Sequence, residues 1–203
     1  MIRFFDIVIS LLLLIILSPV FLLIFIVIKL DSKGAAIFRQ ERVGLNNTNF
    51  IMYKFRSMQT NSQEKSLLTL GDKDDRITGS GTFLRKWKLD ELPQLWNVLI
   101  GDMSMVGPRP ELRKYVDYYT PSEMEILSVK PGITDIASLR YRDEAAILGT
   151  QPDPETYYIK KILPEKIQLN KIYFQKKNLQ NFFRILFNTI LSIIKAFRSF
   201  IIF

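Results

Sequence analysis

The chain has 203 residues, a net charge of +8, and neither cysteine nor histidine. Disulfides, thiol nucleophiles, Ser-His-Asp catalysis and zinc sites built on Cys or His are therefore excluded. Any acid–base or nucleophilic chemistry must come from Asp, Glu, Lys, Tyr, Ser or Thr. The length can bury one core, so we expect one globular domain together with membrane-associated elements.

Residues 7–28 form an apolar segment that is interrupted only by Ser10, Ser18 and Pro19. As a helix, these 22 residues would measure about 33 Å, which is enough to cross a bilayer core. Proline removes one backbone hydrogen bond, so we expect a kink at Ser18–Pro19, where the serine hydroxyl can bond the freed carbonyl. The length of the segment favours a helix that spans the membrane. A re-entrant helix stays possible, because basic residues flank both ends and positive charge prefers the cytoplasmic side.

Residues 36–58 predict a β-hairpin. Ile51, Tyr53 and Phe55 occupy alternate positions, and the polar stretch 45–49 supplies a turn. Residues 59–80 are polar and charged, with Asp72, Asp74 and Asp75 clustered, and they predict a surface loop or a short helix.

Two short helices are expected next, over 83–87 and 91–100. The second carries one apolar stripe, at the spacing i, i+3, i+4 and i+7, that consists of Leu92, Leu95, Trp96 and Leu99. Gly101 would end this helix. Asp90 would then take its N-cap position, where the helix dipole and free N–H groups favour the ionised carboxylate.

The C-terminal part is expected to be helical over 121–128, 155–163 and 165–177. Residues 182–203 are mostly apolar and predict a helix lying in a membrane interface, with a second span as the weaker alternative. Residues 160–203 contain nine basic residues and one acidic residue. Because these charges lie beside Phe- and Ile-rich segments, we expect anionic membrane lipid rather than nucleic acid as their partner. The fold class expected is α+β, mostly helical with a small β-hairpin.

Asp90 and Glu91 are adjacent acids in a basic setting that includes Arg85, Lys86 and Lys88. Neighbouring side chains on a helix point about 100° apart, so this pair cannot hold one atom between them. Separate roles are expected, for example a nucleophile towards phosphorus beside a base or a metal ligand. Ordinary capping of a solvated helix start is the alternative.

An anionic nucleophile that attacks a phosphate needs its repulsion cancelled, typically by Mg²⁺ and arginine. Arg109 lies between Pro108 and Pro110, so its guanidinium would be carried on a stiff backbone. We expect three or four of the basic residues in this set to contact a ligand: Lys54, Arg56, Arg85, Lys88, Arg109, Arg113, Arg140 and Arg142.

At these residues the chain resembles the small monotopic phosphoglycosyl transferases, a family of bacterial sugar transferases. The resemblance runs from the N-terminal segment to about Ile136. It rests on six ordered blocks, namely residues 18–19, 39–44, 54–58, 90–97, 101–110 and 130–134.

The resemblance implies transfer of a sugar 1-phosphate from a nucleoside diphosphate sugar, usually a UDP-sugar, to polyprenyl (undecaprenyl) phosphate. It makes Asp90 the nucleophile that carries a covalent phosphosugar. Glu91 would be a base or would share a Mg²⁺ site with Asp90, and Arg109, Arg85 and Arg113 become candidate phosphate ligands. The reaction would start the assembly of a bacterial glycan, which downstream glycosyltransferases would extend.

The resemblance also implies a re-entrant rather than a spanning N-terminal helix, at the cytoplasmic face of the bacterial inner membrane. Three parts follow: a re-entrant helix over 1–30, a cytosolic catalytic domain over 31–181 and a membrane-interface helix over 182–203. Residues 135–144 depart from the family pattern, which often has Gly-x-x-Gln there, so the donor is the least determined part. Two alternative functions to this transfer reaction are a lipid-anchored, non-enzymatic basic scaffold and a membrane-anchored phosphatase or nucleotide hydrolase.

Overall fold

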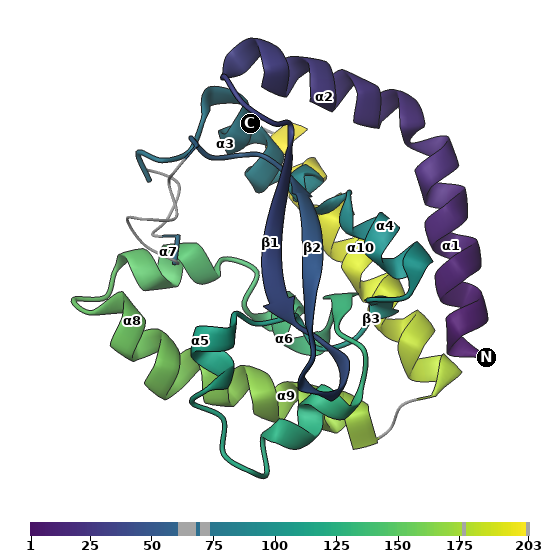
Figure 1. The fold of residues 1–203 in the computed structure, drawn as a ribbon, viewed down its shortest axis with the longest axis vertical. Coiled ribbons are helices and arrows are strands. Elements are labelled where there is room, and N and C mark those ends of the chain that lie inside the picture. Colours follow the sequence, from purple (N-terminus) through teal and green to yellow (C-terminus); the bar gives the residue numbers. More distant parts are fainter. Residues whose placement is uncertain (61–67, 70–73, 176–177, 202–203) are drawn as a thin grey trace.

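The computed structural model describes residues 1–60, 68–69, 74–175 and 178–201. Half of the predicted loop over 59–80, including Asp72, therefore lies outside the described residues. Figure 1 shows the first two helices arching along one side of the molecule, a β-hairpin near the centre, and most of the short helices gathered on the opposite side.

The N-terminal apolar segment forms two helices, α1 (Ile2–Ile16) and α2 (Ser18–Asp31), whose axes are bent by 61°. The Ser18 hydroxyl donates to the Ile15 carbonyl at 2.8 Å, so the serine satisfies a backbone group at the break. This confirms the predicted kink. In the described part of the chain no single helix has the length and apolarity to cross a membrane, whereas the bent pair meets both criteria together.

The predicted hairpin is confirmed. Strands β1 (Ile37–Val43) and β2 (Asn49–Phe55) pair antiparallel, with Ile37 opposite Phe55 at one end and Val43 opposite Asn49 at the other. A 3-10 turn, η1 (Leu45–Asn47), joins them. Asn46 and Asn47 have φ of 53° and 60°, a left-handed conformation that asparagine tolerates.

A second, parallel pair of strands was not predicted. Strand β3 (Ser104–Val106) pairs with β4 (Gly132–Thr134). The two backbones approach so closely that a Cβ atom on Gly132 would lie 2.1 Å from the Gly107 nitrogen. Glycine is required there because no side chain fits between the two segments.

The remaining helices surround these strands. The segments predicted at 155–163 and 165–177 form one continuous run as far as Gln175, the last described residue of the second segment, because Pro164 falls in the first turn of its helix, where proline is tolerated. The helix predicted at 83–87 begins earlier, at Gly79, capped by the Thr78 side chain. The elements are α3 (Gly79–Lys86), η3 (Leu89–Glu91), α4 (Gln94–Ile100), α5 (Arg113–Val116), η4 (Met124–Ser128), α6 (Ile136–Arg140), α7 (Glu144–Gly149), α8 (Pro154–Tyr157), the π-helical η5 (Tyr158–Ile162), α9 (Leu163–Gln175) and α10 (Leu179–Ile201).

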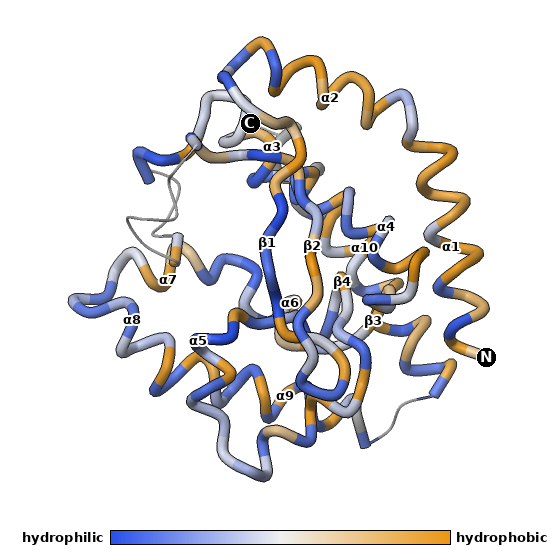
Figure 2. Tube along the Cα trace, in the orientation of Figure 1, coloured by the Kyte–Doolittle hydropathy of each residue, from blue (hydrophilic) through white to orange (hydrophobic). Residues whose placement is uncertain are grey.

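The C-terminal helix α10 belongs to the main core at its N-terminal end. Phe182 and Ile185 are fully buried with residues of α4, β2 and β3, and α1 packs on the same cluster. The predicted parts 1–30, 31–181 and 182–203 therefore share one core. Figure 2 shows the concentration of apolar residues along α1 and α2. The fold is α+β, mostly helical with small two-stranded sheets.

Candidate active site

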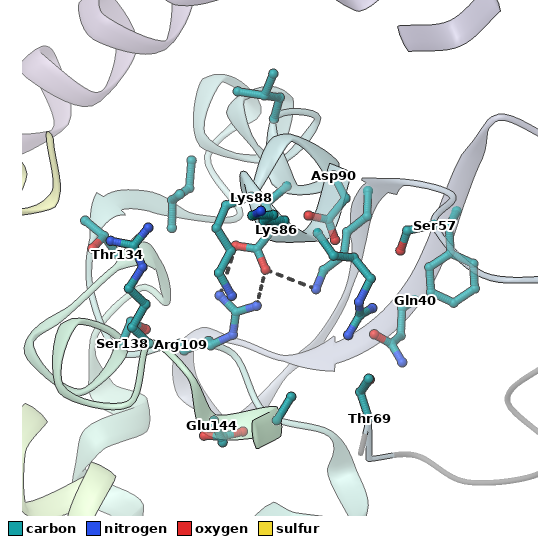
Figure 3. Close-up of a pocket in the computed structure, with 18 of the residues that line it drawn as sticks. Gln40, Ser57, Thr69, Lys86, Lys88, Asp90, Arg109, Thr134, Ser138 and Glu144 are labelled. Atoms are coloured by element: carbon teal, nitrogen blue, oxygen red, sulfur yellow. Dashed lines mark hydrogen bonds and ion pairs between the residues drawn. The ribbon is translucent and has the colours of Figure 1, made fainter. Parts of the chain in front are cut away.

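A cavity of about 2380 Å³ lies between the hairpin, η3, the segment 109–112 and the inner sides of α1 and α10. Figure 3 shows polar side chains from several of these elements pointing into it, among them Asp90, Lys88, Arg109 and Glu144. Both predicted catalytic carboxylates, Asp90 and Glu91, line this cavity.

The predicted N-cap position of Asp90 is wrong. Lys88 adopts a left-handed conformation with φ of 56°, which ends α3 and starts the 3-10 helix η3, and Asp90 lies inside η3. Helix α4 begins only at Gln94, with Pro93 at its cap. The sequence pattern could not distinguish η3 from the first turn of α4, because the apolar stripe runs through both the 3-10 turn and the α-helix.

The ionisation expected for Asp90 also differs. Its side chain is only 6% exposed, and its Oδ1 atom has no hydrogen-bond partner in the part of the chain that the structure describes. Burial and the neighbouring Glu91 carboxylate raise the pKa of Asp90, while the charges of Lys54, Arg85 and Lys88 oppose this shift. A carboxylate with a raised pKa is the more basic of its kind, which favours nucleophilic attack once it is ionised.

Glu91 has different surroundings. Arg109 donates from both terminal nitrogens to its two oxygens, with Nη1 3.1 Å from Oε2, and the Lys54 ammonium lies 3.5 Å from Oε1. Burial acts to raise the pKa of Glu91, but Arg109 and Lys54 outweigh it and hold this pKa well below its usual range. The adjacent carboxylates thus have pKa shifts of opposite direction.

The pKa values of the two cations that contact Glu91 are shifted as well. The Glu91 carboxylate raises the pKa of Arg109 above its usual value, and Arg109 stays charged. Burial lowers the pKa of Lys54 to about 8, although Glu91 opposes this. Lys54 is therefore the cation of this site whose charge depends on pH near neutrality.

Arg109 is fixed through its backbone by Asp135. The Arg109 N–H donates to Asp135 Oδ2 at 2.7 Å, and the Ser138 N–H donates to Asp135 Oδ1, so one carboxylate holds Arg109 and caps α6. Asp135 is 1% exposed. Sequence reasoning missed this role, and the available signal was an acid three residues before Ser138 at a helix start.

The other predicted basic residues do not all meet at the cavity. Arg85 lines it. Arg56 also borders it, but its guanidinium donates to the carbonyls of Ser32 and Lys33 and so ties β2 to the end of α2.

Arg113 and Arg140 lie elsewhere. Arg113 donates to the side chains of Asn47 (2.5 Å) and Asn49 (2.6 Å) at the hairpin turn, outside the cavity. Arg140 does not line the cavity, whereas the next residues, Tyr141 and Arg142, do. The structure thus brings together Lys54, Arg85 and Arg109 with the two acids, and separates Arg113 and Arg140 from them.

A buried polar cluster on the cavity wall was also missed. The Lys166 ammonium lies 3.1 Å from both Glu111 Oε1 and Glu144 Oε2, and the Tyr158 hydroxyl donates to Glu111 at 2.6 Å. Burial acts to lower the pKa of Lys166, but these two carboxylates outweigh it and raise the pKa. One charge of the basic C-terminal region is therefore neutralised inside the protein.

The carboxylates fit a Mg²⁺ ion only in part. In the described ranges no group of three or more acidic side chains is arranged to hold a metal. Magnesium often binds through one or two carboxylates together with substrate phosphates and water. The Asp90 Oδ1 atom, which no described residue contacts through a hydrogen bond, suits such a shared site, whereas both oxygens of Glu91 are engaged by Arg109 and Lys54.

Comparison with known proteins identifies the family. A family model described as bacterial sugar transferase matches residues 1–196. The chain belongs to this family. The match covers both the bent helix pair and the cavity that holds Asp90 and Glu91, so the apolar and the polar elements lie within one family unit.

Three curated relatives of this chain have names that state their reactions. A UDP-N-acetylgalactosamine-undecaprenyl-phosphate N-acetylgalactosaminephosphotransferase from Aeromonas hydrophila is 43% identical over 148 residues, which are 70% of this chain and 35% of that protein. A UDP-glucose:undecaprenyl-phosphate glucose-1-phosphate transferase from Caulobacter vibrioides is 41% identical over 141 residues, 68% of this chain and 53% of that protein. An undecaprenyl-phosphate galactose phosphotransferase from Salmonella typhimurium is 42% identical over 180 residues, 78% of this chain and 36% of that protein.

The chain spans between about a third and a half of the length of these relatives. Their names state three different sugars at similar identity. Similarity to them therefore does not assign a donor sugar to this chain.

Proposed function

We propose that this chain is an enzyme that transfers a sugar 1-phosphate from a UDP-sugar to polyprenyl phosphate. The observation that carries the proposal is the buried Asp90 carboxylate, which has one oxygen without a partner among the described residues and faces a cavity lined by Lys54, Arg85 and Arg109. The stated reactions of the three relatives supply the substrate classes.

In the first step an Asp90 oxygen attacks the sugar-bearing phosphorus of the donor. A bond forms between this oxygen and phosphorus, and the bridging P–O bond breaks, so the nucleoside monophosphate leaves with the electron pair. Arg109 can bind a non-bridging oxygen, because Glu91 and Asp135 hold its side chain and backbone in place. Lys54 and Arg85 add positive charge where the negative charge develops.

Asp90, with the donor diphosphate, would hold Mg²⁺. A bound Mg²⁺ supplies positive charge that favours the ionised carboxylate and offsets the charge of the diphosphate. Glu91 then serves mainly to hold Arg109 and Lys54.

In the second step a phosphate oxygen of polyprenyl phosphate attacks the phosphorus of the phosphosugar. The new P–O bond forms the lipid diphosphate, and the bond to Asp90 breaks and returns the carboxylate. The product is a polyprenyl diphosphate sugar, the substrate class on which downstream glycosyltransferases act. The two steps make the kinetics ping-pong.

We further propose that the bent pair α1–α2 enters the lipid and returns to the same side, the cytoplasmic face of a bacterial inner membrane. Contacts at both ends of the pair support this. Arg3 donates to the carbonyls of Val98 (2.5 Å) and Leu99 (2.8 Å), and at the other end the Ser80 hydroxyl donates to Asp31 at 2.8 Å. Because both ends contact the same domain, a helix that crossed the bilayer would have to give up one set of contacts.

The test is Asp90→Asn, with Asp117→Asn as a matched control on an exposed aspartate outside the cavity. Nucleoside monophosphate release is measured against a panel of UDP-sugars, with undecaprenyl phosphate and Mg²⁺. We expect Asp90→Asn to lower the rate by about 10³-fold or more, and a radiolabelled donor to leave label on the wild-type protein but not on this variant.

A fully active Asp90→Asn variant would overturn the assignment of the nucleophile. Product formation without polyprenyl phosphate would favour a phosphatase or nucleotide hydrolase. Activity that depends on neither Asp90 nor Mg²⁺ would favour a basic scaffold. The structure argues against a scaffold that binds an anionic surface, because Lys166 is buried between two carboxylates and cannot reach such a surface.

A further inference from the structure

The cavity has two chemically different parts. One part contains Asp90, Glu91 and the cations described above. The other part runs between α1 and α10 and is apolar: α1 contributes Leu13 and Leu17, and α10 contributes Phe187 and Ile190. Ile133 of strand β4 lines the cavity between these helices.

The two walls of this apolar part are held by separate sets of contacts. Helix α1 is fixed near its start by Asp6, whose carboxylate accepts from the Ser104 hydroxyl at 2.9 Å and from the Met105 N–H at 2.8 Å. Helix α10 is fixed by a hydrogen bond of 2.8 Å between the hydroxyls of Thr134 and Thr189.

The two helices contact each other near Phe5 and Phe183, and α10 is also tied to Arg142, which lines the cavity. The rings of Phe5 and Phe183 are in contact, with centroids 5.0 Å apart. Further along α10, Arg142 donates to the Ser192 hydroxyl and carbonyl, each at 2.6 Å. The space between α1 and α10 is therefore preformed, since each wall is tied to β3, β4 or the segment that follows them.

We infer that the space lined by Leu13, Leu17, Ile133, Phe187 and Ile190, the apolar groove, holds the isoprenoid chain of the acceptor. This inference rests on the proposed function. A polyprenyl phosphate has one anionic end and a long apolar chain, and the cavity offers cations at one end and a hydrocarbon surface at the other. A nucleotide sugar is polar along its whole length and cannot match the apolar part.

The helices that wall the groove also carry surfaces that suit a lipid. The outer sides of α1, α2 and α10 expose large apolar side chains, including Leu12, Leu22 and Ile194. A chain leaving the groove would pass directly into the bilayer in which the bent pair is proposed to lie. The head group would meanwhile stay near Asp90.

A substitution test uses two isoleucines of α10, one helical turn apart. Ile190 lines the groove and is 54% exposed, whereas Ile194 does not line it and is 45% exposed. Aspartate at either position places a charge on the same helix and should disturb membrane contact similarly. Only Ile190→Asp places the charge where we locate the acceptor chain.

The measurement is the acceptor KM in nanodiscs of phosphatidylethanolamine and phosphatidylglycerol, with undecaprenyl phosphate and with a two-isoprene phosphate as acceptors. For Ile190→Asp we expect the KM for undecaprenyl phosphate to rise about tenfold or more relative to Ile194→Asp, with a smaller rise for the short acceptor. Equal effects of both variants, or equal effects on both acceptors, would overturn the groove assignment.

A second measurement does not depend on how the variants fold. Undecaprenyl phosphate with a photoreactive diazirine in its isoprenoid chain is crosslinked to the wild-type protein, and the adducts are mapped by mass spectrometry. Adducts on residues 13–17 and 187–190 support the groove, and adducts confined to the outer face of α2 overturn it. The two hypotheses fail differently, because a wild-type protein that releases no nucleoside monophosphate from any donor contradicts the proposed function, whatever the adduct positions.

Discussion

Substitution of Asp135 should lower activity through Arg109, although Asp135 itself does not line the cavity. Its carboxylate accepts from the N–H groups of Arg109 and Ser138 and is almost completely buried. Asp135→Ala would remove both acceptors and leave the Arg109 N–H without its partner. The Pro108–Pro110 segment would then lose one of its positioning contacts and keep the hydrogen bond from the Gly132 N–H to the Pro108 carbonyl and that from Arg42 to the Pro110 carbonyl.

The magnitude follows from these two bonds. A hydrogen bond to a charged group contributes about 1.5–3 kcal/mol, and an N-cap about 1 kcal/mol. We therefore expect Asp135→Ala to lower the free energy of unfolding by about 2–4 kcal/mol. A catalytic group displaced by about 1 Å can lose about 100-fold in rate, so kcat/KM should fall by about 10- to 100-fold.

The assay compares Asp135→Ala with Asp153→Ala. Asp153 also caps a helix, accepting from the Thr156 N–H at 3.1 Å, but it lies just before α8 and outside the cavity. Donor-dependent release of nucleoside monophosphate is measured at a temperature where both variants are folded. The reasoning is refuted if Asp135→Ala keeps the wild-type kcat/KM, or if Asp153→Ala loses as much.

Three further predictions follow from the same structure. Because burial lowers the pKa of Lys54 to about 8, wild-type activity should fall as the pH rises through this value and Lys54 loses its charge. The Lys54→Arg variant should keep its activity to higher pH, and identical pH–rate profiles of the two proteins would contradict this. Gly132→Ala should lower the free energy of unfolding in micelles by about 1–3 kcal/mol or more, because its Cβ would lie 2.1 Å from the Gly107 nitrogen; unchanged stability would exclude this close approach. Asp6→Ala should release the start of α1, seen as faster amide exchange over residues 2–16, and unchanged protection would rule out the anchoring role of Asp6.

Several features were readable from the sequence because they depend on neighbours along the chain. Pro19 predicted the break between α1 and α2, since a missing N–H has a local effect. The alternation at 51–55 and the polar turn predicted the hairpin. The ordered blocks around Asp90 and Arg109 predicted the family that the comparison then showed.

Other features depend on contacts between distant segments. Strands β3 and β4 have three residues each and no periodicity to read, yet their pairing fixes Arg109. Contacts between distant segments also decide which basic residues reach the acids, since Arg113 bonds to the hairpin turn and Arg109 bonds to Glu91.

The sequence by itself determined that this protein has a kinked apolar segment and two adjacent acids among many cations. Only the tertiary structure decided that Asp90 is buried, with one oxygen that has no partner in the described ranges, while Glu91 is held by Arg109 and Lys54. The physical reason is that a pKa depends on burial and on charges brought close by folding, and the hairpin, η3 and the Pro108–Pro110 segment are far apart along the chain.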